Sequence, residues 1–228
     1  PGSMIATPLL AKGSGLDWSQ DLAPLGKVGR VPFALAVHPG VPAQTVADLV
    51  KQARQQPGVF NVATSTPSEV LAAAQFMKAA SIQVTRVPYK GGAQALPDLL
   101  AGRVQLMFGP LSLLQPQAKS GALRILATLA PERNAALPDV PTMAEAGLPG
   151  VEVPTWQGLY TAAKVPQALR ARLASDIAAA VARPEMRAEF DRRMLAVEGA
   201  SPQDLATTIT RELAVWAAVV DEYKLTAD

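Results

Sequence analysis

Hydrophobic and polar residues follow one another along the first half of the chain in a pattern that predicts strands alternating with helices. Short apolar runs bounded by proline or glycine predict strands, and the amphipathic stretches between them predict helices. The expected strands cover residues 31–39, 59–63, 82–89, 104–108 and 122–129, and the expected helices cover 45–58, 66–80, 93–102 and 111–121. Strands separated by helices of about 10 to 15 residues predict βαβ crossovers and therefore an α/β fold with mostly parallel sheets.

The helix expected over residues 66–80 has a clearly marked start. Thr66 has the position of an N-cap, Pro67 follows at the first helical position, and Glu69 lies three residues after the cap. This spacing is that of a capping box, in which the N-cap hydroxyl and the acidic side chain each accept a backbone N–H.

The second half of the chain has a different character. Residues 130–155 are rich in proline and glycine and predict a long surface excursion with one short helix at 142–147. The expected elements after it are a strand at 156–166 and helices at 166–183, 184–194 and 201–225. This order predicts two lobes joined near 31–36 and 155–161: residues 37–153 form the second lobe, and 4–36 with 154–228 form a partial first lobe. Residues 1–3 precede Met4 and are interpreted as a cloning scar.

Composition narrows the function classes. The 228 residues are 49% hydrophobic and 18% charged, which indicates a substantial core. The 21 basic and 19 acidic residues are spread along the chain, so no basic patch suggests a nucleic-acid partner. With no cysteine, thiolate metal sites, disulfides and cysteine nucleophiles are excluded. No motif calls for a cofactor or a metal, and no apolar run approaches the roughly 20 residues of a membrane helix.

Three segments carry a family resemblance: VPYKGGAQALPDLLAGRVQLMF (87–108), LRILATLAPERNAALPDVPTMAEAGLPG (123–150) and WQGLYTAAKVPQALRARL (156–173). They resemble the substrate-binding proteins of tripartite tricarboxylate transporters, the Bug or TctC family, and the similarity runs from about Asp17 to Leu225. The resemblance implies a type II periplasmic-binding-protein fold. It also implies a periplasmic, non-enzymatic role, in which two lobes close on a small carboxylate-bearing ligand that is then passed to a membrane permease.

The chain departs from this family at its start. Family members begin with a signal peptide, a first βαβ unit and a glycine-glycine loop that supplies backbone N–H groups to the ligand, and none of these is found here. The first lobe is therefore expected to be incomplete and carboxylate binding to be weak. An apolar stripe on the last helix is then expected to be exposed and to favour a homo-oligomer; it comprises Leu205, Ile209, Leu213 and Trp216.

The turn at residues 89–92 is the first candidate ligand site. Tyr89, Lys90, Gly91 and Gly92 lie where an expected strand gives way to a helix. The N–H groups at such a turn point out of the carboxyl end of the strand, where the helix dipole favours an anion and where α/β sheets bind ligands. In the alternative interpretation, the glycines only permit a tight turn, and the Lys90 side chain is simply solvated.

The second candidate is the loop before the helix at 66–80. Four hydroxyl side chains gather there, namely Thr64, Ser65, Thr66 and Ser68. Hydroxyls and free N–H groups together could bind an anion or a hydroxy acid, whereas capping alone would explain Thr66. The resembled family has a longer, glycine-containing loop at this place and a histidine just inside the helix, where this chain has Glu69 or Val70.

Two further residues complete the candidate site. Gly109 stands where the resembled family often has an aspartate, and it offers only its backbone, which disfavours an amino-acid ligand. Trp156, on the returning strand, is either a wall of the interlobe cleft or part of the packing at the hinge.

Other functions find less support. The single histidine, His38, has no acid nearby in sequence to orient it, and no nucleophile or nucleotide-binding motif is present, so an enzyme is not expected. A transcription regulator would need a recognition helix that is absent. Two alternatives stay open: a protein that presents its ligand to a membrane sensor, and a truncated remnant without binding activity.

Overall fold

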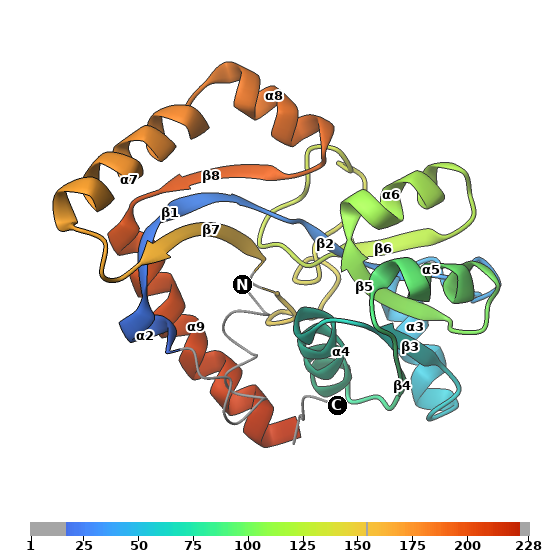
Figure 1. Ribbon diagram of the computed structural model, residues 1–228. Helices are drawn as coiled ribbons and strands as arrows, with labels where there is room; N and C mark the ends of the chain where they lie inside the picture. The colour runs from blue at the N-terminus through green and yellow to red at the C-terminus, as the bar shows by residue number, and fades with distance from the viewer. Residues whose placement is uncertain (1–16, 154, 224–228) are drawn as a thin grey trace. The chain divides into compact units, whose positions relative to one another are not determined.

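The computed structural model describes residues 17–153 and 155–223 (Figure 1). They form two compact units. Unit 1 comprises the described residues up to Val31 and from Thr155 onward, and unit 2 comprises Pro32–Val153. Residues 32–36, which the sequence grouped with the first lobe, belong to unit 2, because strand β2 (Phe33–Val37) pairs over its whole length within the sheet of that unit.

Unit 2 is built on a five-stranded sheet with the strand order β4-β3-β5-β2-β6. Besides β2, its strands are β3 (Asn61–Thr64), β4 (Thr85–Pro88), β5 (Leu106–Pro110) and β6 (Arg124–Thr128). Strand β3 is parallel to β4 and β5, whereas β2 is antiparallel to both of its neighbours. The sheet is thus mixed rather than mostly parallel, because β2 begins at the edge where β5 ends and runs to the edge where β5 begins.

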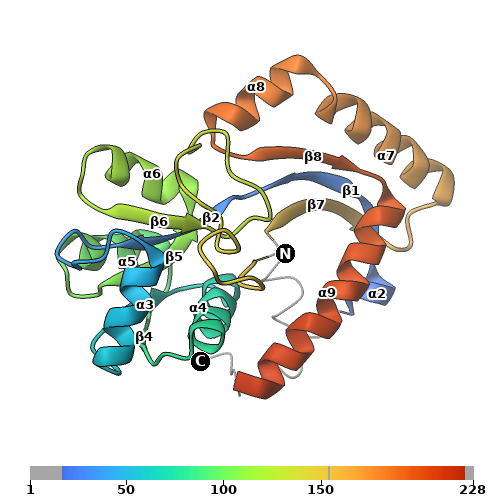
Figure 2. The ribbon, with the colours of Figure 1, turned by 180° about the vertical axis from the view of Figure 1, so that it is seen from behind.

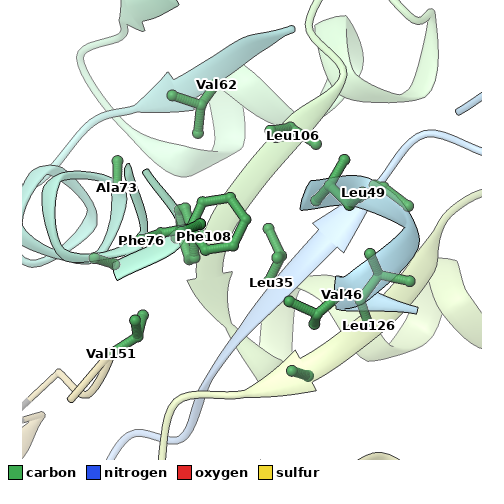
Figure 3. Close-up of a cluster of buried hydrophobic side chains, with 14 of the residues drawn as sticks. Leu35, Val46, Leu49, Val62, Ala73, Phe76, Leu106, Phe108, Leu126 and Val151 are labelled. Atoms are coloured by element: carbon green, nitrogen blue, oxygen red, sulfur yellow. The ribbon is translucent and has the colours of Figure 1, made fainter. Parts of the chain in front are cut away.

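Helices cover both faces of this sheet. Helices α3 (Val46–Gln55) and α4 (Pro67–Ala80) pack on one face, and α5 (Gly92–Leu100) and α6 (Leu111–Lys119) pack on the other. Successive side chains of β5 pack on opposite faces of the sheet: Leu106 and Phe108 lie in the core of the first face, and Met107 lies in the core of the second. Figure 3 shows Phe108 beside Phe76 of α4, with Leu35 and Leu49 nearby in the same core.

Two helix predictions in unit 2 had different outcomes. The capping box at the start of α4 is confirmed, with Thr66 as N-cap and Glu69 as its partner. The short helix expected at 142–147 is instead a series of turns. Thr142 and Glu145 do cap each other, but Thr142 also forms a bridge to Thr128, and Gly147 adopts a φ of 88° that ends the turn.

Unit 1 contains a three-stranded antiparallel sheet with the order β7-β1-β8. Its strands are β1 (Leu22–Arg30), β7 (Trp156–Ala162) and β8 (Ala196–Ala200), and its helices are α2 (Trp18–Asp21), α7 (Gln167–Val181), α8 (Pro184–Arg192) and α9 (Pro202–Tyr223). Helices α7 and α9 lie on opposite sides of this sheet (Figures 1 and 2). The prediction of a mostly parallel sheet in this lobe is therefore wrong for its described part, where both strand pairs are antiparallel.

The apolar stripe on α9 is not exposed. Leu205, Ile209 and Trp216 are between 0% and 1% exposed, and Leu213 is half-buried. The homo-oligomer was expected because this stripe would be exposed. These side chains are already removed from water within the chain, so the stripe gives no reason to expect self-association. Among the described helices, none has the length and apolar character needed to cross a membrane.

Candidate functional site

One edge of the sheet of unit 2 collects most of the residues singled out in the sequence. Strands β3, β4 and β5 run in the same direction, so their carboxyl ends share this edge, and α4, α5 and α6 begin there. The neighbouring strands β3 and β5 continue into helices on opposite faces, α4 and α6. Such a divergence opens the crevice in which α/β sheets bind ligands. The loop at 64–68, the turn at 89–92 and Gly109 therefore come together at this edge.

The start of α5 exposes unused backbone donors. Gly91 is its N-cap in an extended conformation (φ −176°, ψ 154°), the helix has no side-chain cap, and its first turn holds no acid. Among the described residues, the N–H groups of Gly92 and Ala93 have no hydrogen-bond partner. Neither glycine has a positive φ, and a Cβ added at Gly91 would meet nothing within 4 Å. The backbone conformation thus does not require glycine at these positions, and the space in front of Gly91 is open.

Tyr89 and Lys90 have different surroundings. The Tyr89 N–H donates to the carbonyl oxygen of Thr64 (2.8 Å), and its hydroxyl donates to Asp98 (2.8 Å). Asp98 also accepts a hydrogen bond from Arg103 (2.8 Å), and these two donors hold the pKa of the Asp98 carboxyl below its ordinary value. Tyr89 therefore ties the turn to β3 and α5, while the Lys90 side chain is exposed to solvent.

The loop before α4 is occupied by a carboxylate from within the chain. Glu69 Oε2 accepts hydrogen bonds from the Ser65 N–H (2.5 Å), the Ser65 hydroxyl (2.7 Å) and the Thr66 N–H (3.3 Å). The Thr66 hydroxyl in turn accepts the N–H of Glu69 (3.4 Å), so it acts as a cap. Glu69 is 2% exposed, and this burial raises the pKa of its carboxyl against the opposing effect of those hydrogen bonds. The capping-box spacing indicated Glu69 as a helix-start residue but gave no sign of its contact with Ser65.

The remaining predicted residues of unit 2 lie beside this loop. Thr64 and Ser68 are buried, and the Thr64 hydroxyl has no hydrogen-bond partner among the described residues. Gly109 is buried within β5 opposite Ala34 of β2, so it forms part of the sheet rather than a free loop. The next N–H along, that of Leu111 at the start of α6, donates to the carbonyl oxygen of Pro32 (2.8 Å).

Trp156 lies in unit 1, at the start of β7. Its indole is 4% exposed and donates its Nε1–H to Glu212 of α9 (2.8 Å). Three buried polar atoms around this contact have no partner among the described residues, namely Tyr160 Oη, Glu212 Oε2 and Trp216 Nε1. In unit 1, therefore, the Trp156 side chain contributes to a buried polar cluster between the sheet and α9.

This cluster predicts a pH-dependent stability. Burial raises the pKa of the Glu212 carboxyl above its ordinary value near 4.5, although the hydrogen bond from Trp156 opposes the rise. An acid whose pKa is raised by folding gives stability that is fully present below its unfolded pKa and is lost as the pH rises through the folded pKa. We expect Glu212→Gln to remove this loss, so its Tm advantage over the unchanged protein should grow between about pH 4 and pH 7.

Thermal denaturation at several pH values measures this difference. Glu185→Gln on the exposed surface of α8 is the control for the loss of one acidic side chain. A Tm difference for Glu212→Gln that stays constant across the pH range would contradict the prediction.

The sequence matches a known protein family over almost its whole length. Residues 3–225 match the family model described as "Tripartite tricarboxylate transporter family receptor", TctC. The chain belongs to this family. The UPF0065 protein encoded in the tcbD-tcbE intergenic region of Pseudomonas sp. (strain P51) is 31% identical over 212 residues, which is 92% of this chain and 63% of that protein. BugT of Bordetella pertussis (strain Tohama I) is 32% identical over 139 residues, covering 60% of this chain and 43% of BugT. The chain thus spans less than two thirds of the length of both relatives.

Solved structures of other proteins share the fold. R. palustris Rpa4515 with adipate is 31% identical with a TM-score of 0.87, over 96% of this chain and 74% of that chain. The periplasmic binding protein BugD is similar in fold, with a TM-score of 0.84 at 24% identity, over 99% of this chain and 77% of BugD. The prediction of a periplasmic-binding-protein-like α/β fold is confirmed by this likeness. BugD is described as a periplasmic binding protein, and a structure from Polaromonas that is 21% identical, with a TM-score of 0.80, is described as a TctC solute-binding protein.

Proposed function

We propose that this chain is a periplasmic solute-binding receptor that captures a small carboxylate-bearing metabolite and delivers it to the membrane permease of a tripartite tricarboxylate transporter. The observation that carries the proposal is the start of α5, where the N–H groups of Gly92 and Ala93 are unpaired among the described residues and no acid occupies the first turn. Unpaired N–H groups and the positive end of the helix dipole together attract an anion.

The kinship with a carboxylate-bound protein supports this assignment. Rpa4515 of R. palustris, which is 31% identical to this chain, carries adipate. In our proposal, the carboxylate of the ligand accepts hydrogen bonds from Gly92 and Ala93, and Tyr89 fixes the position of the turn through Thr64 and Asp98. Lys90 adds a positive charge nearby without a specific contact.

Binding without catalysis fits the side chains at this edge. Glu69, the buried acid there, is engaged by Ser65 and Thr66. His38 accepts a hydrogen bond from the N–H of Gly40 through Nδ1 (3.0 Å), which gives it a role in a turn after β2, at the opposite edge of the sheet. His38 and Glu69 therefore lie at opposite edges of the sheet and do not act together on one ligand.

Amide NMR titration tests the proposal and detects weak binding. With the ¹⁵N-labelled protein, adipate should shift the amide resonances of Gly92 and Ala93 in a saturable way, because both N–H groups would donate to the carboxylate. Adipic acid dimethyl ester, which keeps the chain length but lacks the charge, is the matched control and should not shift them. Shifts that follow ionic strength alone, or no shift with adipate, hydroxy acids and aromatic acids, would contradict the function.

A further inference from the structure

We propose that Glu69 determines specificity by excluding a second ligand carboxylate, so that the protein selects acids with one carboxylate and a hydrogen-bond donor at the far end. This inference rests on the proposed function, because it describes the other side of the same crevice. Glu69 lies at the start of α4, beside β3, while the ligand carboxylate is assigned to the start of α5, after β4, the strand that pairs with β3.

Three of the donors at the start of α4 are already used by Glu69. At the start of α4, the N–H groups of Ser65 and Thr66 and the Ser65 hydroxyl all donate to Oε2 of Glu69. Pro67, at the first helical position, has no N–H to offer. An incoming carboxylate would thus meet the negative charge of Glu69 beside these engaged donors, and like charges brought together disfavour binding.

The unpaired polar atoms around Glu69 suit a donor from the ligand. All of the hydrogen bonds that the carboxylate accepts use Oε2, and Oε1 has no hydrogen-bond partner among the described residues. Glu69 as a whole is only 2% exposed, but Oε1 is not one of its fully buried atoms. The hydroxyl of Thr64, also 2% exposed, is likewise unpaired within the described part of the chain. Oε1 is therefore open to a donor, and a hydrogen bond to a charged oxygen stabilises a complex. A ligand hydroxyl or N–H group directed at Oε1 supplies that bond.

The contrast between two acids of equal length measures this selectivity. Adipate has a carboxylate at both ends, whereas 6-hydroxyhexanoate has the same chain with one end replaced by a hydroxyl. We expect the unchanged protein to bind 6-hydroxyhexanoate about tenfold more tightly than adipate or better, as judged from amide NMR titrations. In Glu69→Gln this ratio should fall by about tenfold, because the amide removes the negative charge and keeps the shape.

A matched control separates this effect from loss of a helix cap. Asp48 forms the equivalent capping box with Thr45 at the start of α3, a helix that follows β2 and none of the strands β3, β4 and β5 whose ends form the candidate site. Asp48→Asn should leave the ratio unchanged. The preference of the unchanged protein between the two acids is a second measurement that needs no variant to fold.

The outcomes distinguish this inference from the function on which it rests. A preference for adipate in the unchanged protein, or an equal ratio in the unchanged protein and in Glu69→Gln, would overturn the role of Glu69 while leaving carboxylate binding intact. Saturable binding of neither acid by any of the proteins would overturn the proposed function and this inference with it.

Discussion

Replacing Phe108 with alanine should lower the free energy of unfolding by about 3 to 5 kcal/mol, the range found when a large aromatic side chain is deleted from a core. Phe108 is fully buried in β5, at the centre of the larger core of unit 2. Its ring meets that of Phe76 edge to face, with centroids 5.7 Å apart and an interplanar angle of 64° (Figure 3). Such pairs add about 0.5 to 1.5 kcal/mol beyond the area they bury.

Urea denaturation followed by circular dichroism measures this loss. Val59, 44% exposed just before β3, provides the control, since Val59→Ala should change stability by about 0.5 kcal/mol at most. If Phe108→Ala cost no more than the Val59 variant, the core would not be organised around the contact between β5 and α4.

The elements that the sequence predicted are those whose signals are local. The start of α4 follows from a few neighbouring residues, since Thr66, Pro67 and Glu69 fix it through a cap that needs nothing from the rest of the chain. By contrast, β1 contains Pro24 and a Gly26 with a φ of 153°, and its register shifts in two places. Its partners β7 and β8 lie more than a hundred residues away, so its pairing could not be read from periodicity.

The direction of β2 was also beyond the reach of the sequence. Its buried residues, Ala34 to Val37, are apolar on both faces, as in any central strand, and this pattern is the same for a parallel and an antiparallel neighbour. Only the structure shows that β2 lies between β5 and β6 and is antiparallel to both, which makes the sheet mixed.

The position of the candidate site was predictable from the sequence. Which of its hydrogen-bond donors are free was not. Strand-to-helix turns in βαβ units share one edge of a sheet, which is why the loop at 64–68 and the turn at 89–92 could be assigned to the same place. Whether a given donor is free depends on side-chain rotamers, which the sequence does not show. The hydroxyls of Ser65 and Thr66 looked equally available, yet both are engaged with Glu69, whereas the donors of Gly92 and Ala93 are unpaired among the described residues.

Replacing Gly92 with proline should weaken carboxylate binding by about tenfold to a hundredfold, because a hydrogen bond to a charged group contributes about 1.5 to 3 kcal/mol. Proline removes the N–H at the first position of α5 and leaves the helix intact. That position favours proline, as Pro67 shows at the start of α4, and the extended Gly91 before it has the conformation that a residue preceding proline adopts.

Gly92→Ala is the matched control for this variant. It adds the same Cβ, which would approach the side-chain ends of Leu113 (3.0 Å) and Met107 (3.4 Å), but it keeps the N–H. We therefore expect Gly92→Ala to retain most of the affinity for adipate and Gly92→Pro to lose it, as measured by the titration shift of the Ala93 amide. Equal losses in both variants would mean that crowding against Leu113 and Met107, and not the missing donor, controls binding, and the carboxylate would then have to be held somewhere other than the start of α5.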